Sequence, residues 1–225
     1  MLKSTIETAL AIKAVEPESF KRVIVDSTVQ PKAIAYPVDS RLLEVARHQV
    51  VRVARAVGVQ LKQTFAREGK TLRRRAGGYA HARQFKRLRK VLRRQRTVLG
   101  KLIRELRRKL PSVEAIPEKL QEKVQTVLKR AEKLHQQKPK DKNKLYAMHA
   151  PEVECISKGK ARQRYEFGVK SSLVVTHKEG LIVGARTFPG NPYDGHVLCA
   201  QLEQTGILLQ DVGPVSYTHL RAHET

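Results

Sequence analysis

One span of the chain, residues 70–109, combines two patterns that together allow few structures. It holds 17 Lys or Arg and one acid, Glu105, so it carries +16 of the formal net charge of +24. Apolar residues recur in it at steps of three and four, the spacing of one face of an α-helix. They are Phe85, Leu88, Leu92, Leu99, Leu102 and Leu106, with Gln95 in the one polar position. The pattern predicts a long basic helix over residues 79–110.

Two neighbouring segments also carry a helical pattern. Residues 40–67 show an apolar stripe that follows Ser40, a residue type that suits a helix N-cap. The stripe consists of Leu42, Leu43, Ala46, Val50, Val53, Ala54, Val57 and Leu61. Residues 70–78 end in a Gly-Gly pair and are expected to form the turn into the long helix. A third helix is expected over residues 117–137, so the region predicts an antiparallel helical hairpin with a third helix packed nearby.

Near the N-terminus, the apolar run Val23-Ile24-Val25 predicts a buried strand. Asp26 follows it, and a carboxylate fixed at the end of a buried strand is costly unless it is paired or binds a metal. The alternative, that Asp26 only accepts backbone hydrogen bonds in a turn, stays open. Before this strand, Ser4 and Glu7 have the spacing of a capping box, which predicts a short helix toward Lys13.

After a polar, charged segment at residues 138–144, expected to be a linker or an exposed loop, the periodicity changes to that of strands. Residues 165–176 and 181–188 flank a turn and predict a β-hairpin. A turn-rich stretch that includes Asp194 follows, and then a helix expected over residues 196–210. The first strand must pair with this hairpin to bury its apolar face. The chain is therefore predicted to be an α/β protein with a basic helical-hairpin insertion after its first strand.

These expectations divide the chain into four parts. Residues 1–36 form the N-terminal helix and first strand, residues 37–145 the basic insertion, and residues 146–214 the strand hairpin and last helix. Residues 215–225 have no periodicity that continues this helix, and they resemble a peptide translated from sequencing-adapter DNA. We expect this tail to be non-native or disordered.

Other classes of protein find little support. The two cysteines lie far apart and suggest neither a disulfide framework nor a zinc knuckle. The sequence has no HExxH motif, no phosphate-binding loop and no nucleophile elbow. It also has no 18-residue apolar stretch and no signal-peptide pattern at its start, so a cytoplasmic protein with no membrane partner is expected.

Four segments, taken in order, resemble the DDE transposases of bacterial insertion sequences, a ribonuclease H-like group. They read VIVDSTVQ at residues 23–30, YPVDSRLL at 36–43, YEFGVK at 165–170 and PGNPYDGH at 189–196. The resemblance covers nearly everything up to about Gly213. It implies a mixed ribonuclease H-like sheet, here incomplete, and makes Asp26 the first catalytic Asp and a metal ligand.

The resemblance also implies Mg²⁺ or Mn²⁺ as the cofactor of the full-length protein, which would cleave DNA and transfer strands. The family's second Asp and its Glu have no match here. Asp194 precedes the last helix, and Asp211 lies in the exit turn of that helix. We therefore expect a fragment truncated at both ends, inactive alone and holding no metal stably.

The basic span is expected to contact phosphates, because it has almost no acids to balance its cations. The expected partners are transposon ends and target DNA and, for the full-length protein, a second copy in a homodimer. The expected DNA-binding residues are Arg73, Arg74, Arg75, Arg83, Lys86, Arg87, Lys90, Arg93, Arg94, Arg104 and Lys170. Two alternatives stay open: a non-catalytic basic nucleic-acid-binding protein in which Asp26 is structural, and an interaction protein whose heptad helix pairs with a partner.

Overall fold

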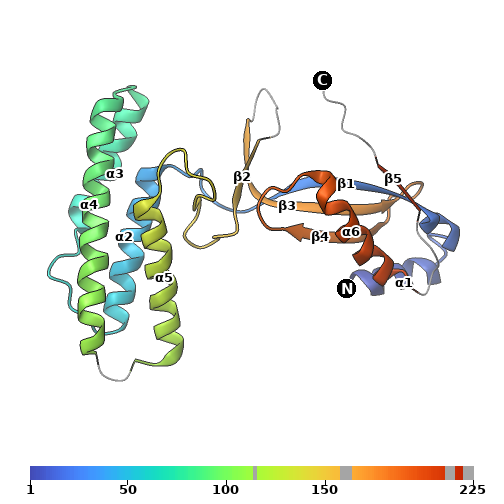
Figure 1. Ribbon diagram of the computed structural model, residues 1–225, viewed down its shortest axis with the longest axis horizontal. Helices are drawn as coiled ribbons and strands as arrows, with labels where there is room; N and C mark the ends of the chain where they lie inside the picture. Colours follow the sequence, from blue (N-terminus) through green and yellow to red (C-terminus); the bar gives the residue numbers. More distant parts are fainter. Residues whose placement is uncertain (114–115, 158–163, 211–215, 220–225) are drawn as a thin grey trace. The chain divides into compact units, whose positions relative to one another are not determined.

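The computed structural model describes residues 1–113, 116–157, 164–210 and 216–219 (Figure 1). The chain divides into two compact units: unit 1 comprises residues 1–32 and 154–225, and unit 2 comprises residues 33–153. The segment expected to be a basic insertion, residues 37–145, lies entirely within unit 2. The unit 1 sequence is therefore interrupted by a separately packed unit.

Unit 1 is built on a sheet with β3 at its centre. β1 pairs antiparallel with one edge of β3, and β2 followed by β4 pairs antiparallel with the other edge. β5 pairs with the free edge of β1 in parallel. The strands are β1 (Arg22–Pro31), β2 (Glu154–Ser157), β3 (Tyr165–Thr176), β4 (Ile182–Phe188) and β5 (Ser216–His219).

One face of this sheet carries the core of unit 1. Helices α1 (Leu2–Ala11) and α6 (Asp194–Leu208) pack against the sheet, α6 mainly over β4 (Figure 1). Side chains alternate between faces along a strand, so every second residue of β1 joins this core. The buried core residues are Ile6, Ala9, Val15, Phe20, Val23, Val25, Val174, Val183 and Leu209.

The chain leaves and re-enters unit 1 beside a single residue, Gly168. It is buried in β3 with Pro31 opposite it on one edge and Glu154 opposite it on the other. A Cβ at this position would lie 2.2 Å from the backbone carbonyl oxygen of Gln30. Because that oxygen belongs to backbone and cannot swing away, only glycine fits here without moving β1.

Several details of unit 1 differ from the sequence-based expectations. The capping box at Ser4 is wrong: α1 begins at Leu2, and the Ser4 carbonyl accepts an intrahelical bond from Thr8 Oγ. β2 was not expected, since four residues are too few to show an alternating pattern. The tail was expected to lie outside the fold, but residues 216–219 form β5; residues 215 and 220–225 lie outside the described residues.

Unit 2 is a bundle of helices packed side by side (Figure 1). Helices α2 and α4 each contact all three of the other helices, so these two form the middle of the bundle. The apolar stripe of α2 from Leu42 to Val57 is buried as the sequence predicts. The helices are α2 (Asp39–Ala56), α3 (Ala66–His81), α4 (Phe85–Lys109) and α5 (Glu118–Gln136).

The turn expected at residues 70–78 is wrong, because these residues lie inside α3. Glycine costs a helix only about 1 kcal/mol relative to alanine, and the surrounding strong helix formers outweigh the Gly77-Gly78 pair. Leu72 and Ala76 of the same helix are buried against Val91 of α4. The chain instead reverses at residues 82–84, where Arg83 adopts a left-handed φ of 54°.

The start of α2 also differs from the expectation. The helix begins at Asp39 with Val38 as its cap, so Ser40 is not the N-cap. Ser40 is buried, and its carbonyl oxygen accepts a hydrogen bond of 3.1 Å from Gln95 Nε2. The one polar position of the α4 seam therefore binds the first turn of α2.

The heptad seam of α4 is used inside unit 2. Leu99, Leu102 and Leu106 are completely buried in the core shared by α2, α4 and α5. Phe85, at the start of the seam, is 58% exposed. Because most of the seam is already covered by this chain, the hypothesis that it exists to pair with a partner helix loses its support.

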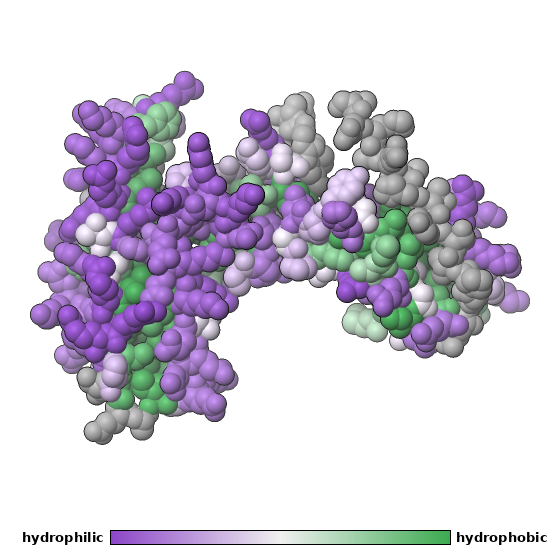
Figure 2. Space-filling view, in the orientation of Figure 1, coloured by the Kyte–Doolittle hydropathy of each residue, from purple (hydrophilic) through white to green (hydrophobic). Residues whose placement is uncertain are grey.

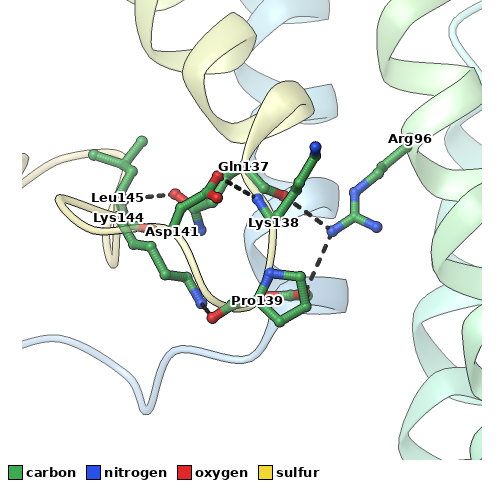
Figure 3. A network of polar contacts seen from close by, with 8 residues as sticks. Arg96, Gln137, Lys138, Pro139, Asp141, Lys144 and Leu145 are labelled. Carbon is green, nitrogen blue, oxygen red and sulfur yellow. Dashed lines mark hydrogen bonds and ion pairs between the residues drawn. The ribbon is translucent and has the colours of Figure 1, made fainter.

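The loop at residues 138–144 contains neither helix nor strand, as expected, but polar contacts hold it to the bundle (Figure 3). Gln137 Oε1 accepts a hydrogen bond of 2.6 Å from the Leu145 amide, which joins the two ends of the loop. Arg96 of α4 donates to the Gln137 carbonyl at 3.3 Å, and the Lys138 amide donates to Asp141 Oδ2 at 2.8 Å. The loop is thus part of the packed unit.

Candidate functional site

Asp26 lies in the middle of β1 and not at the end of the strand, which corrects the sequence-based expectation. It is the fifth of ten strand residues, and its side chain is exposed. Its neighbour across the sheet is Leu173 of β3. The argument that Asp26 needs a metal to offset buried charge therefore fails, because water reaches this carboxylate.

A cluster of polar side chains surrounds Asp194, at the start of α6. Ser27 Oγ donates a hydrogen bond of 2.6 Å to Asp194 Oδ1, and Lys170 Nζ forms an ion pair with the same carboxylate. These residues line an open pocket of about 670 Å³ that is also lined by β2 and the 191–193 loop. Neighbouring strand residues point to opposite faces, so Ser27 and Asp194 lie on the sheet face opposite Asp26.

Among the described residues, no three His, Cys, Asp or Glu side chains come together in a way that could hold a metal ion. A two-metal site for phosphodiester chemistry needs several carboxylates on rigid elements. Asp26 can supply one such ligand. Asp211, the acid after α6, lies outside the described residues.

The division of charge between the two units is the clearest electrostatic feature. Unit 2 contains 32 Lys and Arg against 10 Asp and Glu, a formal charge of +22, which leaves +2 for unit 1. Hydrophilic side chains cover most of the visible surface of unit 2 in Figure 2. A polyanion that meets this protein is therefore attracted to the helices and not to the sheet.

Ten of the expected DNA-binding residues are exposed on α3, on α4 or in the turn between them. They are Arg73, Arg74, Arg75, Arg83, Lys86, Arg87, Lys90, Arg93, Arg94 and Arg104. Two of these have acceptors within the protein. Arg94 forms two hydrogen bonds of 2.6 and 3.1 Å with Glu68, and Arg87 donates to Gln84 at 2.9 Å. The Arg94 hydrogen bonds hold the pKa of Glu68 below its usual value.

Lys170 is placed differently from these residues. It lies in unit 1, its side chain is 12% exposed, and its ammonium group contacts the Pro192 carbonyl as well as Asp194. These contacts fix the loop before α6 to β3. Lys170 therefore has a structural role within unit 1, and its place in the expected DNA-binding set stays a prediction.

Glu105, the one acid of the basic span, also has a structural role. Its carboxylate accepts hydrogen bonds of 2.8 Å from Lys109 Nζ and from the Lys62 amide, and these bonds lower its pKa. Lys109 in turn donates to the Gln60 carbonyl at 2.6 Å. The contacts hold the α2–α3 connection against α4, so Glu105 does not neutralise the outward-facing cations.

His135 of α5 lies between two helices and close to the cations Arg96 and Arg104. His135 of α5 packs where Gly100 leaves room on α4, since a Cβ at Gly100 would lie 2.7 Å from His135 Nε2. Burial lowers the pKa of His135, and Arg104 and Arg96 lower it further. His135 is therefore an interhelical packing residue of unit 2.

One cation that precedes the basic span, Arg52, was not among the expected DNA-binding residues. Arg52 of α2 and His48 face a pocket shared with Lys70, Arg73 and Arg74 of α3. In the sequence, Arg52 and His48 stand at polar positions of an amphipathic helix, which indicates only that they face outward. A charge count along the chain cannot show that this face lies beside α3.

Comparisons with known proteins leave the family open. No family model matches the chain, and no solved structure matches it. The chain is similar to an uncharacterized protein, ORF8 in the nfe locus of Rhizobium meliloti, with 51% identity over 85 residues. The matched region is 38% of this chain and spans 41% of the length of that protein.

In the part of the chain that the structure describes, none of the helices has both the length and the apolar content needed to cross a bilayer.

Proposed function

We propose that this chain binds nucleic acid through unit 2 and is part of a DDE-type transposase. The observation that carries the binding proposal is the charge division: +22 lies on the helical unit and +2 on the sheet unit. A surface that served only solubility would mix charges of both signs. Phosphates are the anions that match so many arginines, because a guanidinium can donate two hydrogen bonds to one phosphate.

The topology of unit 1 supports the transposase part of this proposal. β1, which carries Asp26, has an antiparallel neighbour on one side and a parallel neighbour, reached through α6, on the other. A mixed sheet of this kind is what the ribonuclease H-like resemblance implies. Asp26 would then be one of the carboxylate ligands of a two-metal Mg²⁺ or Mn²⁺ site, whose ions would supply activation of the attacking oxygen and stabilisation of the leaving one.

The binding proposal is tested by titrating the chain into fluorescein-labelled 30-base-pair duplexes of two unrelated sequences and following anisotropy. We expect dissociation constants of about 1–100 μM near physiological salt and less than a threefold difference between sequences. As a matched control, Lys3, Lys21 and Lys178 of unit 1 are changed together to Gln; we expect no more than a twofold loss. No binding to either duplex, or a loss of binding in this control, would contradict the proposal.

A second candidate function shares the binding surface but not the chemistry. The exposed carboxylate of Asp26 favours a non-catalytic nucleic-acid-binding protein, because among the described residues no three His, Cys, Asp or Glu side chains come together as a metal site would need.

The two candidates differ in the effect of Asp26→Asn on a longer natural protein that includes this chain. If Asp26 is a metal ligand, the substitution abolishes Mg²⁺-dependent cleavage of transposon-end DNA and keeps DNA binding, because it removes charge and little volume. Asp194→Asn is the matched control and keeps most activity, since Asp194 is held by Ser27 and Lys170. Equal loss in both variants would place the active site elsewhere, and cleavage unaffected by Asp26→Asn would make Asp26 structural.

A further inference from the structure

A groove on unit 2, between α2 and α3, is lined by cations from both helices. Its volume is about 610 Å³. The cations that line it are Arg52 from α2 and Lys70, Arg73 and Arg74 from α3, and all four are exposed. The α3 residues are spaced by three and four, so one face of the helix carries all of them.

Glu44, the acid that lines the groove, is neutralised by the neighbouring Arg47 of the same helix. Glu44 accepts two hydrogen bonds, of 2.7 and 2.9 Å, from the Arg47 guanidinium, and the Arg47 side chain is 6% exposed. Arg47 also donates to the Thr64 carbonyl at 2.8 Å. Within the described part of the chain, none of the four lining cations forms an ion pair. The groove therefore presents a net charge of about +4 from cations on two helices.

Two glycines of α3 shape this groove. At Gly69 the helices approach closely, since a Cβ there would lie 2.3 Å from Glu44 Oε2 and 2.6 Å from Arg47 Nε. Two turns further along α3, Gly77 lines the groove and has open space where a Cβ would stand. Val45, 38% exposed, forms part of the wall. The groove has an apolar wall and a cationic rim, and it stays open because position 77 has no side chain.

We propose that this groove seats the phosphodiester backbone of one nucleic-acid strand, an inference that rests on the proposed nucleic-acid binding by unit 2. Arginines from two helices face a common space, which allows bidentate contacts to phosphate oxygens from both sides. Further exposed cations lie on α3 and α4 outside the groove, so the unit offers more basic surface to a strand that extends beyond it. An acidic peptide would satisfy the same four charges but would gain less from the positive surface beyond them.

The test compares Gly77→Leu with Gly78→Leu in the full chain. Both positions lie in α3 with open space around them, and both changes favour the helix by replacing glycine. Only Gly77 lines the groove. We expect Gly77→Leu to weaken binding of a labelled 20-nucleotide single strand and of a duplex by about tenfold, and Gly78→Leu by less than twofold. Circular dichroism checks that both variants keep their helix content.

A second pair of variants tests the position of the charge, because each variant loses one positive charge and the two have the same net charge. Arg74 lines the groove and Arg75, its neighbour in the same Arg-Arg-Arg run, does not. We expect about a tenfold loss for Arg74→Gln and a two- to threefold loss for Arg75→Gln, which removes only general attraction.

The outcomes separate this inference from the function on which it rests. If the unaltered chain binds no DNA, the proposed function fails. If it binds DNA and the members of each pair behave alike, the groove does not hold the strand and this inference alone is wrong. If poly-glutamate binds the chain in a Gly77-dependent way while DNA binding ignores Gly77, the occupant is an acidic peptide.

Discussion

Raising the salt concentration from about 50 to 200 mM is expected to weaken duplex binding by about a thousandfold. The logarithm of the binding constant falls with the logarithm of salt concentration at a slope of about 0.9 per neutralised phosphate. Ten of the proposed contact residues are exposed on α3, α4 and their connecting turn, so six phosphate contacts are within reach. Anisotropy titrations at four salt concentrations give the slope, and an affinity that stays flat over this range would contradict the electrostatic basis of the proposal.

A triple variant shows where the salt dependence originates. Replacing Arg87, Arg94 and Arg104 together by Ala should lower the slope of log binding constant against log salt by up to about 2.7, which is about 0.9 for each of three lost phosphate contacts. The helix content should stay the same, because Arg and Ala are both good helix formers. Arg94 should contribute the least of the three, since Glu68 already accepts two of its hydrogen bonds. A slope unchanged in the triple variant would place the contacts on another part of unit 2.

Val25→Asp is expected to destabilise unit 1 by about 3–5 kcal/mol, enough to unfold it in most of the molecules. Val25 is 7% exposed and packs in the core with Phe20 and Val174. A carboxylate at this position loses its hydration among the apolar residues of the core. Hydrogen exchange should show lost protection of the β1 and β3 amides while the α2, α4 and α5 amides stay protected.

Lys90→Glu is the matched comparison, because it also introduces an acid but at an exposed position of α4. Surface substitutions of this kind usually change stability by less than about 0.5 kcal/mol. Both units should keep their protection, and DNA affinity should fall. Similar loss of folding in both variants would mean that β1 is not in the core of unit 1.

The sequence predicts the helices and strands best where their apolar residues meet within the same unit. Leu99, Leu102 and Leu106 repeat at helical spacing and are all completely buried. β3 runs from Tyr165 to Thr176 as its alternation indicates. The pattern fails where a local rule competes with packing. Gly77-Gly78 resembles a turn, yet Leu72 and Ala76 hold that stretch in a helix against α4.

The candidate sites are harder to predict, because exposure and partners depend on distant residues. Asp26 was expected at a strand end, but β1 continues through five more residues that pair with β3. Lys170 counts as a cation in the sequence, yet Asp194 and the Pro192 carbonyl, more than twenty positions away, occupy its ammonium group. The α2–α3 groove has no signature in the sequence, because it forms only when two helices meet at Gly69.

The position of Gly168 has a consequence for how this chain is assembled. Pro31 and Glu154, the residues between which unit 2 is inserted, lie on the two strands that flank Gly168. Adjacent strands are about 4.8 Å apart, so these two points are separated by roughly 10 Å, a gap that about four residues can bridge. Unit 2 is thus an insertion whose two attachment points in the sheet, Pro31 and Glu154, lie close together. A gene could exchange residues 33–153 for a linker of about four residues and still encode a continuous sheet, so nucleic-acid binding and the Asp26 strand are separable in evolution as well as in the laboratory.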